Sequence, residues 1–199
     1  MRLPCVAALA LALGLAGCGS GSFGEPTSGF DFPQVAQIYV PLHGRDWTLI
    51  GHDGASVVIA PGIAATNAHN ANMVDPRSVI GTVDGYDLLY FRTDKAVTPA
   101  IAKAVEGEDV IAYGQDADGK LRVSRGVIRR MWPAAFGFVS DAGPGFSGGP
   151  VVDAKTGALL GITYGYEGDT DAKTRLMVAY TMDFVMDRLA AVQSRAAAH

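Results

Sequence analysis

The chain has 199 residues, of which 49% are hydrophobic and 18% are charged, and its formal net charge is -4. This length allows one compact domain or two small lobes, and this composition supports a hydrophobic core and argues against general disorder. The chain has no basic stripe, so we expect no nucleic-acid partner.

The first residues predict a secretory signal peptide. Over residues 1–17 one Arg is followed by an apolar run and small residues, a segment too short and wrongly flanked for a spanning helix. Its end, L-A-G-C at Leu15–Cys18, resembles the lipobox of bacterial lipoproteins. That resemblance implies cleavage before Cys18 and acylation of its thiol and amine (lipidation, including palmitate). Ordinary signal cleavage, which leaves a free Cys, is the alternative.

The residues after the signal peptide predict a tethered domain. Residues 18–33 contain the lipidated Cys and a stretch rich in Gly and Ser, which is typical of a flexible tether. The only other cysteine, Cys5, lies in the signal peptide, so we expect no disulfide in the mature domain. We expect a monomer on the bacterial cell envelope, anchored to the membrane by its lipid (on the periplasmic face if the bacterium is Gram-negative).

Residues 34–199 predict a domain of many short strands. Apolar or alternating segments punctuated by turns favour an all-β fold of two small barrels. Residues 93–108 are weakly patterned, which divides the domain into lobes at about 34–95 and 105–181. Apolar residues then recur at three and four positions, predicting a C-terminal α-helix over 182–196.

The stretch D-A-G-P-G-F-S-G-G-P, Asp141–Pro150, surrounds one serine with glycines and prolines. A Ser hydroxyl becomes a nucleophile only beside a base that a third group orients, and the reaction also needs donors for an oxyanion. Gly145, Gly148 and Gly149 leave the backbone N–H groups around Ser147 accessible. Alone, this stretch fits a plain surface loop equally well.

The chain offers four histidines as candidates for the base. His199 ends a polar tail, and His43 and His52 lie in turn-like sequence. His69 instead follows V-V-I-A-P-G-I-A-A-T-N-A, which predicts a strand, a turn and a second strand, so it lies at the end of a buried hairpin. No His stands in a metal-ligand pattern, so we expect no metal and no cofactor. A structural histidine is the alternative for His69.

Two aspartates are candidates for the orienting acid. Asp87 opens the apolar segment D-L-L-Y-F-R, which predicts a strand with the carboxylate at its entrance. Asp84 stands three residues earlier and remains a rival. We favour Asp87 because it directly adjoins the strand.

Three motifs together resemble a known family. T-N-A-H (66–69), D-L-L-Y-F (87–91) and G-F-S-G-G-P (145–150) occur in the order His, Asp, Ser, the order of chymotrypsin-type proteases. Over about 47–189 the chain is similar to bacterial trypsin-like serine proteases near the glutamyl-endopeptidase and HtrA-like branches. The resemblance implies two packed six-stranded antiparallel β-barrels with a C-terminal helix.

The resemblance also implies roles for individual residues. Ser147 would be the nucleophile, His69 the general base and acid, and Asp87 the group that orients His69. The N–H groups of Gly145 and Ser147 would form the oxyanion hole. The activity implied is that of a serine endopeptidase acting on a polypeptide substrate.

Two departures from the family pattern are visible. Only 87 − 69 = 18 residues separate His69 from Asp87, which predicts a reduced first barrel. Phe146 stands where digestive trypsins have an Asp that pairs with a new N-terminal amine. Phe146 cannot form this ion pair, so we expect that the protein is not activated by cleavage that creates a new N-terminal amine.

The substrate site is less clearly indicated. Asp141 lies six residues before Ser147, where the trypsin branch has the acid of its S1 pocket; a structural Asp is the alternative. By resemblance, Tyr164, Gly165 and Tyr166 would line the edge that pairs with an extended substrate.

Two other functional classes compete with the peptidase. G-F-S-G-G also fits the G-x-S-x-G motif of α/β-hydrolases, but a strand follows the Ser, and the only later His is His199. A catalytically inactive protease-fold lipoprotein that binds a peptide or protein partner is the stronger alternative.

Overall fold

The computed structural model describes residues 23–44, 53–167 and 176–196. The predicted signal peptide and Cys18 lie outside these residues. No helix among the described residues has the length and apolar character needed to cross a membrane.

The first lobe is a five-stranded antiparallel sheet in the order β2-β3-β4-β6-β5. A hairpin at its centre turns at Pro61 and Gly62, where the φ of +75° at Gly62 suits a residue without a side chain. The strands are β2 (Tyr39–His43), β3 (Asp53–Ala60), β4 (Ile63–Thr66), β5 (Val79–Thr82) and β6 (Leu89–Arg92).

The second lobe is a closed barrel of six antiparallel strands, because β9 pairs with both β12 and β8. A short strand, β1 (Glu25–Pro26), adds to the outer edge of β8. The barrel strands are β7 (Asp109–Gln115), β8 (Leu121–Met131), β9 (Ala135–Val139), β10 (Pro150–Asp153), β11 (Leu159–Glu167) and β12 (Leu176–Thr181). The predicted fold class is confirmed, and the first sheet has one strand fewer among the described residues than the six expected.

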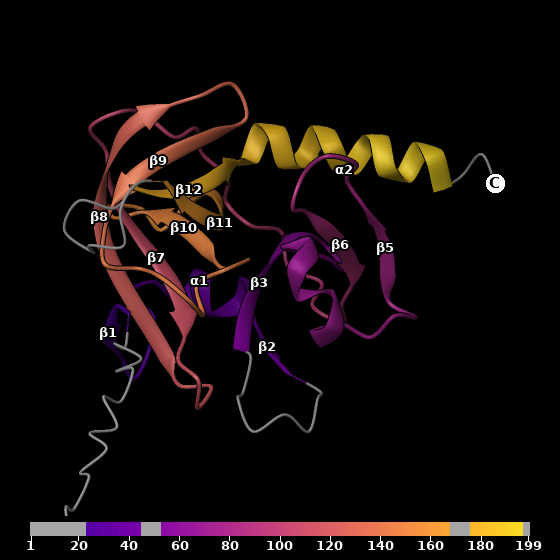
Figure 1. Ribbon diagram of the computed structural model, residues 1–199, viewed down its shortest axis with the longest axis horizontal. Coiled ribbons are helices and arrows are strands. Elements are labelled where there is room, and N and C mark those ends of the chain that lie inside the picture. Colours follow the sequence, from indigo (N-terminus) through magenta and orange to yellow (C-terminus); the bar gives the residue numbers. More distant parts are fainter. Residues whose placement is uncertain (1–22, 45–52, 168–175, 197–199) are drawn as a thin grey trace, which may run out of the picture.

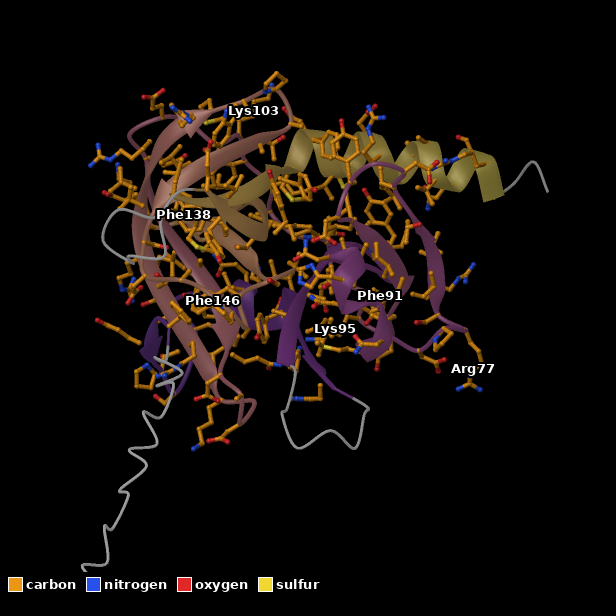
Figure 2. All side chains as sticks on the ribbon, in the orientation of Figure 1. Arg77, Phe91, Lys95, Lys103, Phe138 and Phe146 are labelled. Carbon is orange, nitrogen blue, oxygen red and sulfur yellow. The ribbon has the colours of Figure 1, made fainter. Side chains whose placement is uncertain are left out.

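Three clusters of buried apolar residues stabilise the lobes, and the two larger ones border the site. Phe136, Phe138 and Phe146 are fully buried inside the second barrel, and Figure 2 shows Phe138 and Phe146 on that side of the molecule. A larger core runs from the first sheet to the C-terminal helix and includes Tyr90 and Leu159. The core of the second barrel includes Ala142 and Phe146, so it packs directly against the loop that carries Ser147.

The C-terminal helix α2 (Met182–Ala196) joins the lobes. It leaves the second barrel after β12 and runs across the first lobe beside β5 (Figure 1). The Tyr90 hydroxyl in β6 donates a hydrogen bond of 2.6 Å to the Val185 carbonyl. Two shorter helical segments, α1 (Pro33–Ile38) and the 3-10 helix η1 (Ala68–Met73), lie in the N-terminal segment and after β4.

The N-terminal segment is more ordered than a flexible tether from Phe23 onward. Beyond the pairing of β1, the Asp31 carboxylate accepts hydrogen bonds from Tyr113 at 2.5 Å and Arg125 at 2.7 Å. Phe30 packs on Tyr113 with ring centroids 4.9 Å apart. The aromatic residues, rather than the surrounding Gly and Ser, determine where this part of the chain lies, because they bury apolar area against the barrel.

Candidate active site

His69 and Asp87 meet at the edge of the first lobe. His69 belongs to η1, immediately after β4, and Asp87 ends the turn before β6. One carboxylate oxygen of Asp87 lies 2.6 Å from His69 Nδ1, and the other accepts the His69 backbone N–H at 3.0 Å. This double contact fixes both the backbone and the ring of His69, and Nε2 is the ring nitrogen that Asp87 does not contact.

Asp84 lies elsewhere. Its carboxylate forms an ion pair of 2.8 Å with Arg195 near the end of α2. The geometry therefore brings Asp87, and not its rival, to His69.

A residue of the second lobe supports Asp87. The Asp87 backbone N–H donates to the Tyr180 hydroxyl at 3.1 Å, and the Tyr180 ring stacks on Tyr164 at 4.0 Å. Burial raises the pKa of Tyr180 to about 12, against a smaller lowering by the Asp87 backbone contact. Tyr180 is therefore a neutral hydroxyl over the working pH range of most proteins, and it links the Asp87 turn to β12.

Ser147 lies in the loop Asp141–Pro150, which we call the Ser147 loop. The Phe146 N–H donates to the Gly143 carbonyl at 3.0 Å, which closes a turn with Pro144 second and Gly145 third. The φ of Gly145 is +92°, as a type II turn requires of its third residue. Gly148 also has a positive φ, +82°, and a Cβ there would collide with the Ala55 carbonyl and Thr66 Oγ1.

The backbone donors of this loop fall into two groups. The N–H groups of Phe146, Gly148 and Gly149 bond to carbonyls within the fold at 2.8–3.0 Å. Within the described residues, the N–H groups of Gly145 and Ser147 have no hydrogen-bond acceptor. Such unpaired donors beside a serine are what an oxyanion hole needs.

Asn70 connects the two lobes under Ser147. Its amide donates to the Ser147 carbonyl and to Thr66 Oγ1, both at 3.0 Å, and the Ala55 N–H donates to the same Ser147 carbonyl at 3.0 Å. Sequence reasoning missed Asn70, although it directly follows His69. The signal in the sequence was an amide side chain directly after the candidate base. In the structure this side chain is 2% exposed, and a buried amide needs hydrogen-bond partners.

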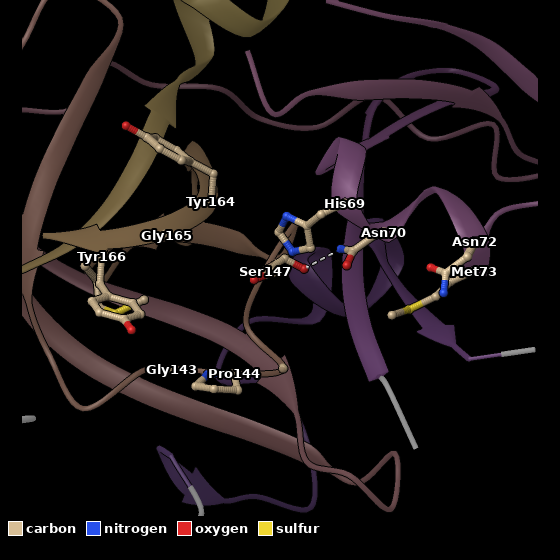
Figure 3. Close-up of a pocket in the computed structure, with 12 residues that line it drawn as sticks. His69, Asn70, Asn72, Met73, Gly143, Pro144, Ser147, Tyr164, Gly165 and Tyr166 are labelled. Carbon is tan, nitrogen blue, oxygen red and sulfur yellow. Dashed lines mark hydrogen bonds between the residues drawn. The ribbon is translucent and has the colours of Figure 1, made fainter. Parts of the chain in front are cut away.

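A cleft of about 500 Å³ opens in front of His69 and Ser147, whose side chains lie next to each other in Figure 3. Gly143–Gly145 and Tyr164–Tyr166 of β11 line it, and the buried Met177 is a further lining residue. Among the described residues, the pairing of β10 with β11 extends only to Ile162, so Tyr164 and Gly165 lie beyond it on the edge of β11 that lines the cleft.

Asp141 lies outside this cleft. Its carboxylate accepts a hydrogen bond from the Ser124 hydroxyl, and it lines a separate hollow with Val123 and Arg125. Its backbone carbonyl accepts the Gly24 N–H at 3.1 Å. These contacts favour the structural alternative for Asp141 over the floor of a substrate pocket.

In the part of the chain that the structure describes, no three His, Cys, Asp or Glu side chains gather in a way that suits a metal ion.

This arrangement of two β lobes with a Ser, His and Asp at their junction defines a class of protein. The family model of the trypsin-like peptidase domain matches residues 51–162, just over half of the chain. The chain belongs to this family. No curated protein matches it.

Solved structures share the fold at low sequence identity. A serine endoprotease from Yersinia pestis superposes with a TM-score of 0.69 and 18% identity over 84% of this chain and 68% of its own. The active form of a protease from M. tuberculosis gives 0.66 and 21% over 84% and 88%. The HtrA-type protease AlgW with a tripeptide gives 0.67 and 18% over 82% of this chain. This chain spans only 63% of AlgW, less than two thirds of its length.

Proposed function

We propose that the protein is a serine endopeptidase that uses Ser147, His69 and Asp87. The observation that carries the proposal is the 2.6 Å contact between His69 Nδ1 and Asp87, at the mouth of a cleft that Ser147 also lines. Because Asp87 accepts the Nδ1 proton, Nε2 is the nitrogen free to take a proton from Ser147.

The first half of the reaction is acylation. Ser147 Oγ attacks the substrate carbonyl carbon while His69 Nε2 accepts the hydroxyl proton, and Asp87 stabilises the resulting imidazolium. The negative charge on the substrate oxygen is stabilised by the N–H groups of Gly145 and Ser147, each contributing about 2.7–4 kcal/mol in enzymes of this kind. His69 then protonates the departing amine, and the acyl group stays on Ser147.

The second half repeats these steps with water. His69 deprotonates a water that attacks the acyl carbon, the same two N–H groups stabilise the oxyanion, and His69 returns the proton to Ser147. No cofactor is needed at either stage.

The substrate in this proposal is an extended polypeptide. The edge of β11 at Tyr164 and Gly165, beyond its pairing with β10, suits the addition of a substrate strand, and AlgW, which shares the fold, has been solved with a tripeptide. Because Met177 and glycines line the cleft and Asp141 lies outside it, we expect cleavage after apolar residues. Profiling Asp141→Ala on a peptide library should give the same cleavage pattern; a specific loss of cleavage after Lys or Arg would return Asp141 to the pocket.

Labelling with a fluorophosphonate probe tests the activity. We expect the full-length chain to react, and Ser147→Ala and His69→Ala to lose the reaction while they keep their circular dichroism spectra. Absence of labelling in folded wild-type protein would contradict the proposal and favour the inactive peptide-binding alternative.

We also propose that lipid on Cys18 holds the peptidase, as a monomer, at the bacterial envelope. The L-A-G-C motif at the end of the apolar run supports this. Cys18→Ser should move the protein from the membrane fraction to the soluble fraction, and continued membrane fractionation would contradict lipidation.

A further inference from the structure

The residues that precede β1 contact the outer side of the Ser147 loop. The ring of Phe23 lies directly over Gly143, so that a Cβ on this glycine would collide with it. Phe23 is half-buried and packs against the same core cluster as Ala142 and Phe146. Gly143 is also a wall residue of the cleft. The ring therefore lies behind the wall whose front faces the substrate.

Gly24 makes two more contacts with the same loop. Its N–H donates to the Asp141 carbonyl at 3.1 Å. A Cβ on Gly24 would come within 2.6 Å of Phe146 Cζ, and its φ of +66° disfavours any side chain. Phe23 and Gly24 thus touch the loop at its start, at its turn and beside Ser147.

This contact segment is itself held firmly. Glu25 pairs with Val123 of β8, and the Thr27 N–H donates to the Leu121 carbonyl at 3.2 Å. These bonds attach the backbone directly after the contact to the barrel, which restrains the position of the Phe23 ring over Gly143.

The part of the loop that Phe23 covers sets the direction of the oxyanion donors. The turn from Gly143 to Phe146 determines where the Gly145 N–H points. Besides the Phe23 ring, it is restrained by its own bond from the Phe146 N–H to the Gly143 carbonyl at 3.0 Å and by the Gln115 N–H on the Gly145 carbonyl at 3.1 Å. In enzymes a displacement of about 1 Å in such a group costs up to about 100-fold in rate. Removing the ring would leave the turn open to solvent on its outer side.

We propose that Phe23 is a positioning residue for catalysis: its ring holds the Gly143–Phe146 turn in the shape that directs the Gly145 and Ser147 N–H groups into the cleft. This inference rests on the proposed peptidase function. Phe146 stands where digestive trypsins have an Asp, and here the Phe23 ring and the Gly24 N–H contact the loop instead. The segment that follows the predicted tether is in this way part of the support of the active site.

The test compares three variants in the full-length chain in detergent. Phe23→Ala removes the ring, and Phe23→Leu keeps an apolar side chain over Gly143. Phe32→Ala is the matched control, since Phe32 lies in the same N-terminal segment, is also half-buried, and packs on a glycine, Gly157, at the turn between β10 and β11. Thermal unfolding shows whether the two alanine variants lose similar stability.

Peptide hydrolysis and fluorophosphonate labelling rates are then measured well below the lowest unfolding temperature. For Phe23→Ala we expect kcat and the labelling rate to fall about 10- to 100-fold with KM little changed, the range that misplacement of a catalytic group produces. Phe23→Leu should be intermediate. Phe32→Ala should match the wild-type kcat. Equal kcat in Phe23→Ala and Phe32→Ala would overturn the proposal.

Hydrogen exchange of peptides covering 141–149 gives a readout that does not need activity. Faster exchange there in Phe23→Ala, and not in Phe32→Ala, is expected whether or not the wild-type protein reacts with the probe. Unchanged exchange would overturn the positioning role. A wild-type protein that neither hydrolyses peptides nor reacts with the probe would contradict the peptidase function. The exchange result would still show whether Phe23 holds the Gly143–Phe146 turn.

Discussion

The Ser147 loop is surrounded by the fold, whereas the His69–Asp87 pair lies at the surface. Ala55 and Asn70 of the first lobe bond to the Ser147 carbonyl, and the loop's glycines touch backbone on several sides. The side chains of His69 and Asp87 are 50% and 32% exposed, and a direct hydrogen bond is their main link. Ser147 is thus positioned by packing, and the His69 side chain by one carboxylate.

Because of this difference, we expect substitutions in the two regions to have different effects on stability and activity. Changes in the loop should affect the free energy of unfolding together with activity, because the loop is part of the packed interior. Changes at the His69–Asp87 pair should affect activity while the fold persists, because little apolar area depends on these side chains.

The largest expected effect is on kcat at the exposed pair. Asp87→Asn keeps the shape of the side chain but no longer holds the proper His69 tautomer, and kcat should fall about 10⁴-fold with little change in unfolding temperature. Asp84→Asn is the control, because Asp84 pairs with Arg195 instead. Steady-state kinetics decide: equal losses in the two variants would show that Asp87 has no special role.

The next effect is on stability in the loop. Gly148→Ala should lower the free energy of unfolding by about 3 kcal/mol or more, since a Cβ meets two fixed oxygen atoms and strained φ adds about 1–3 kcal/mol. Gly85 has a similar φ of +77° but open space around it, so Gly85→Ala measures the φ strain alone. Denaturant unfolding should show the larger loss of unfolding free energy for Gly148→Ala. Equal losses would mean that the loop relaxes around the new Cβ, contrary to its close packing.

Tyr180→Phe should have a smaller effect on activity. It removes the hydroxyl that accepts the Asp87 N–H but keeps the ring stacked on Tyr164, and a lost bond of about 1 kcal/mol corresponds to roughly fivefold in kcat. Tyr90→Phe is the control, because it also removes a tyrosine hydroxyl, one that donates to the Val185 carbonyl and does not contact Asp87. That variant should lose stability and keep its kcat, and a wild-type kcat in Tyr180→Phe would exclude the support of Asp87 through Tyr180.

The smallest effect concerns pH and the attachment of the N-terminal segment. The Tyr113 hydroxyl, together with Arg125, holds the pKa of Asp31 below its usual value. Because the folded pKa is lowered, the contribution of Asp31 is present above the unfolded pKa of about 3.9 and is lost as the pH falls below it. Asp31→Asn should therefore be slightly less stable than wild type at pH 7 and equal to it near pH 2. Melting curves at both values test this, and a constant difference would contradict it.

The sequence predicted the parts of the site that are local. His69 at the end of a hairpin and Ser147 among glycines follow from short patterns, and Asp87 follows from its place before a strand. These patterns work because turn geometry and strand boundaries depend on neighbouring residues.

The contacts that support the site were not predictable in this way. Asn70 reaches Ser147 across 77 residues and Tyr180 reaches Asp87 across 93, so no local pattern marks either pair. Phe23 was assigned to the tether because Gly and Ser surround it, and only the folded barrel provides the glycine beneath its ring. Composition indicates the average behaviour of a segment. It does not show where the segment packs when a single aromatic residue finds a complementary surface in the folded protein.

The Ser147 carbonyl has a consequence for the lifetime of the protein. It accepts one N–H from β3 and one from Asn70, so the lobes cannot move apart without releasing the loop that carries the nucleophile. If the protein is the proposed peptidase, a molecule would therefore lose its activity at the moment when its strands become accessible to cleavage. Molecules that begin to open would be substrates for their intact neighbours without being able to cleave them, and this would limit autolysis.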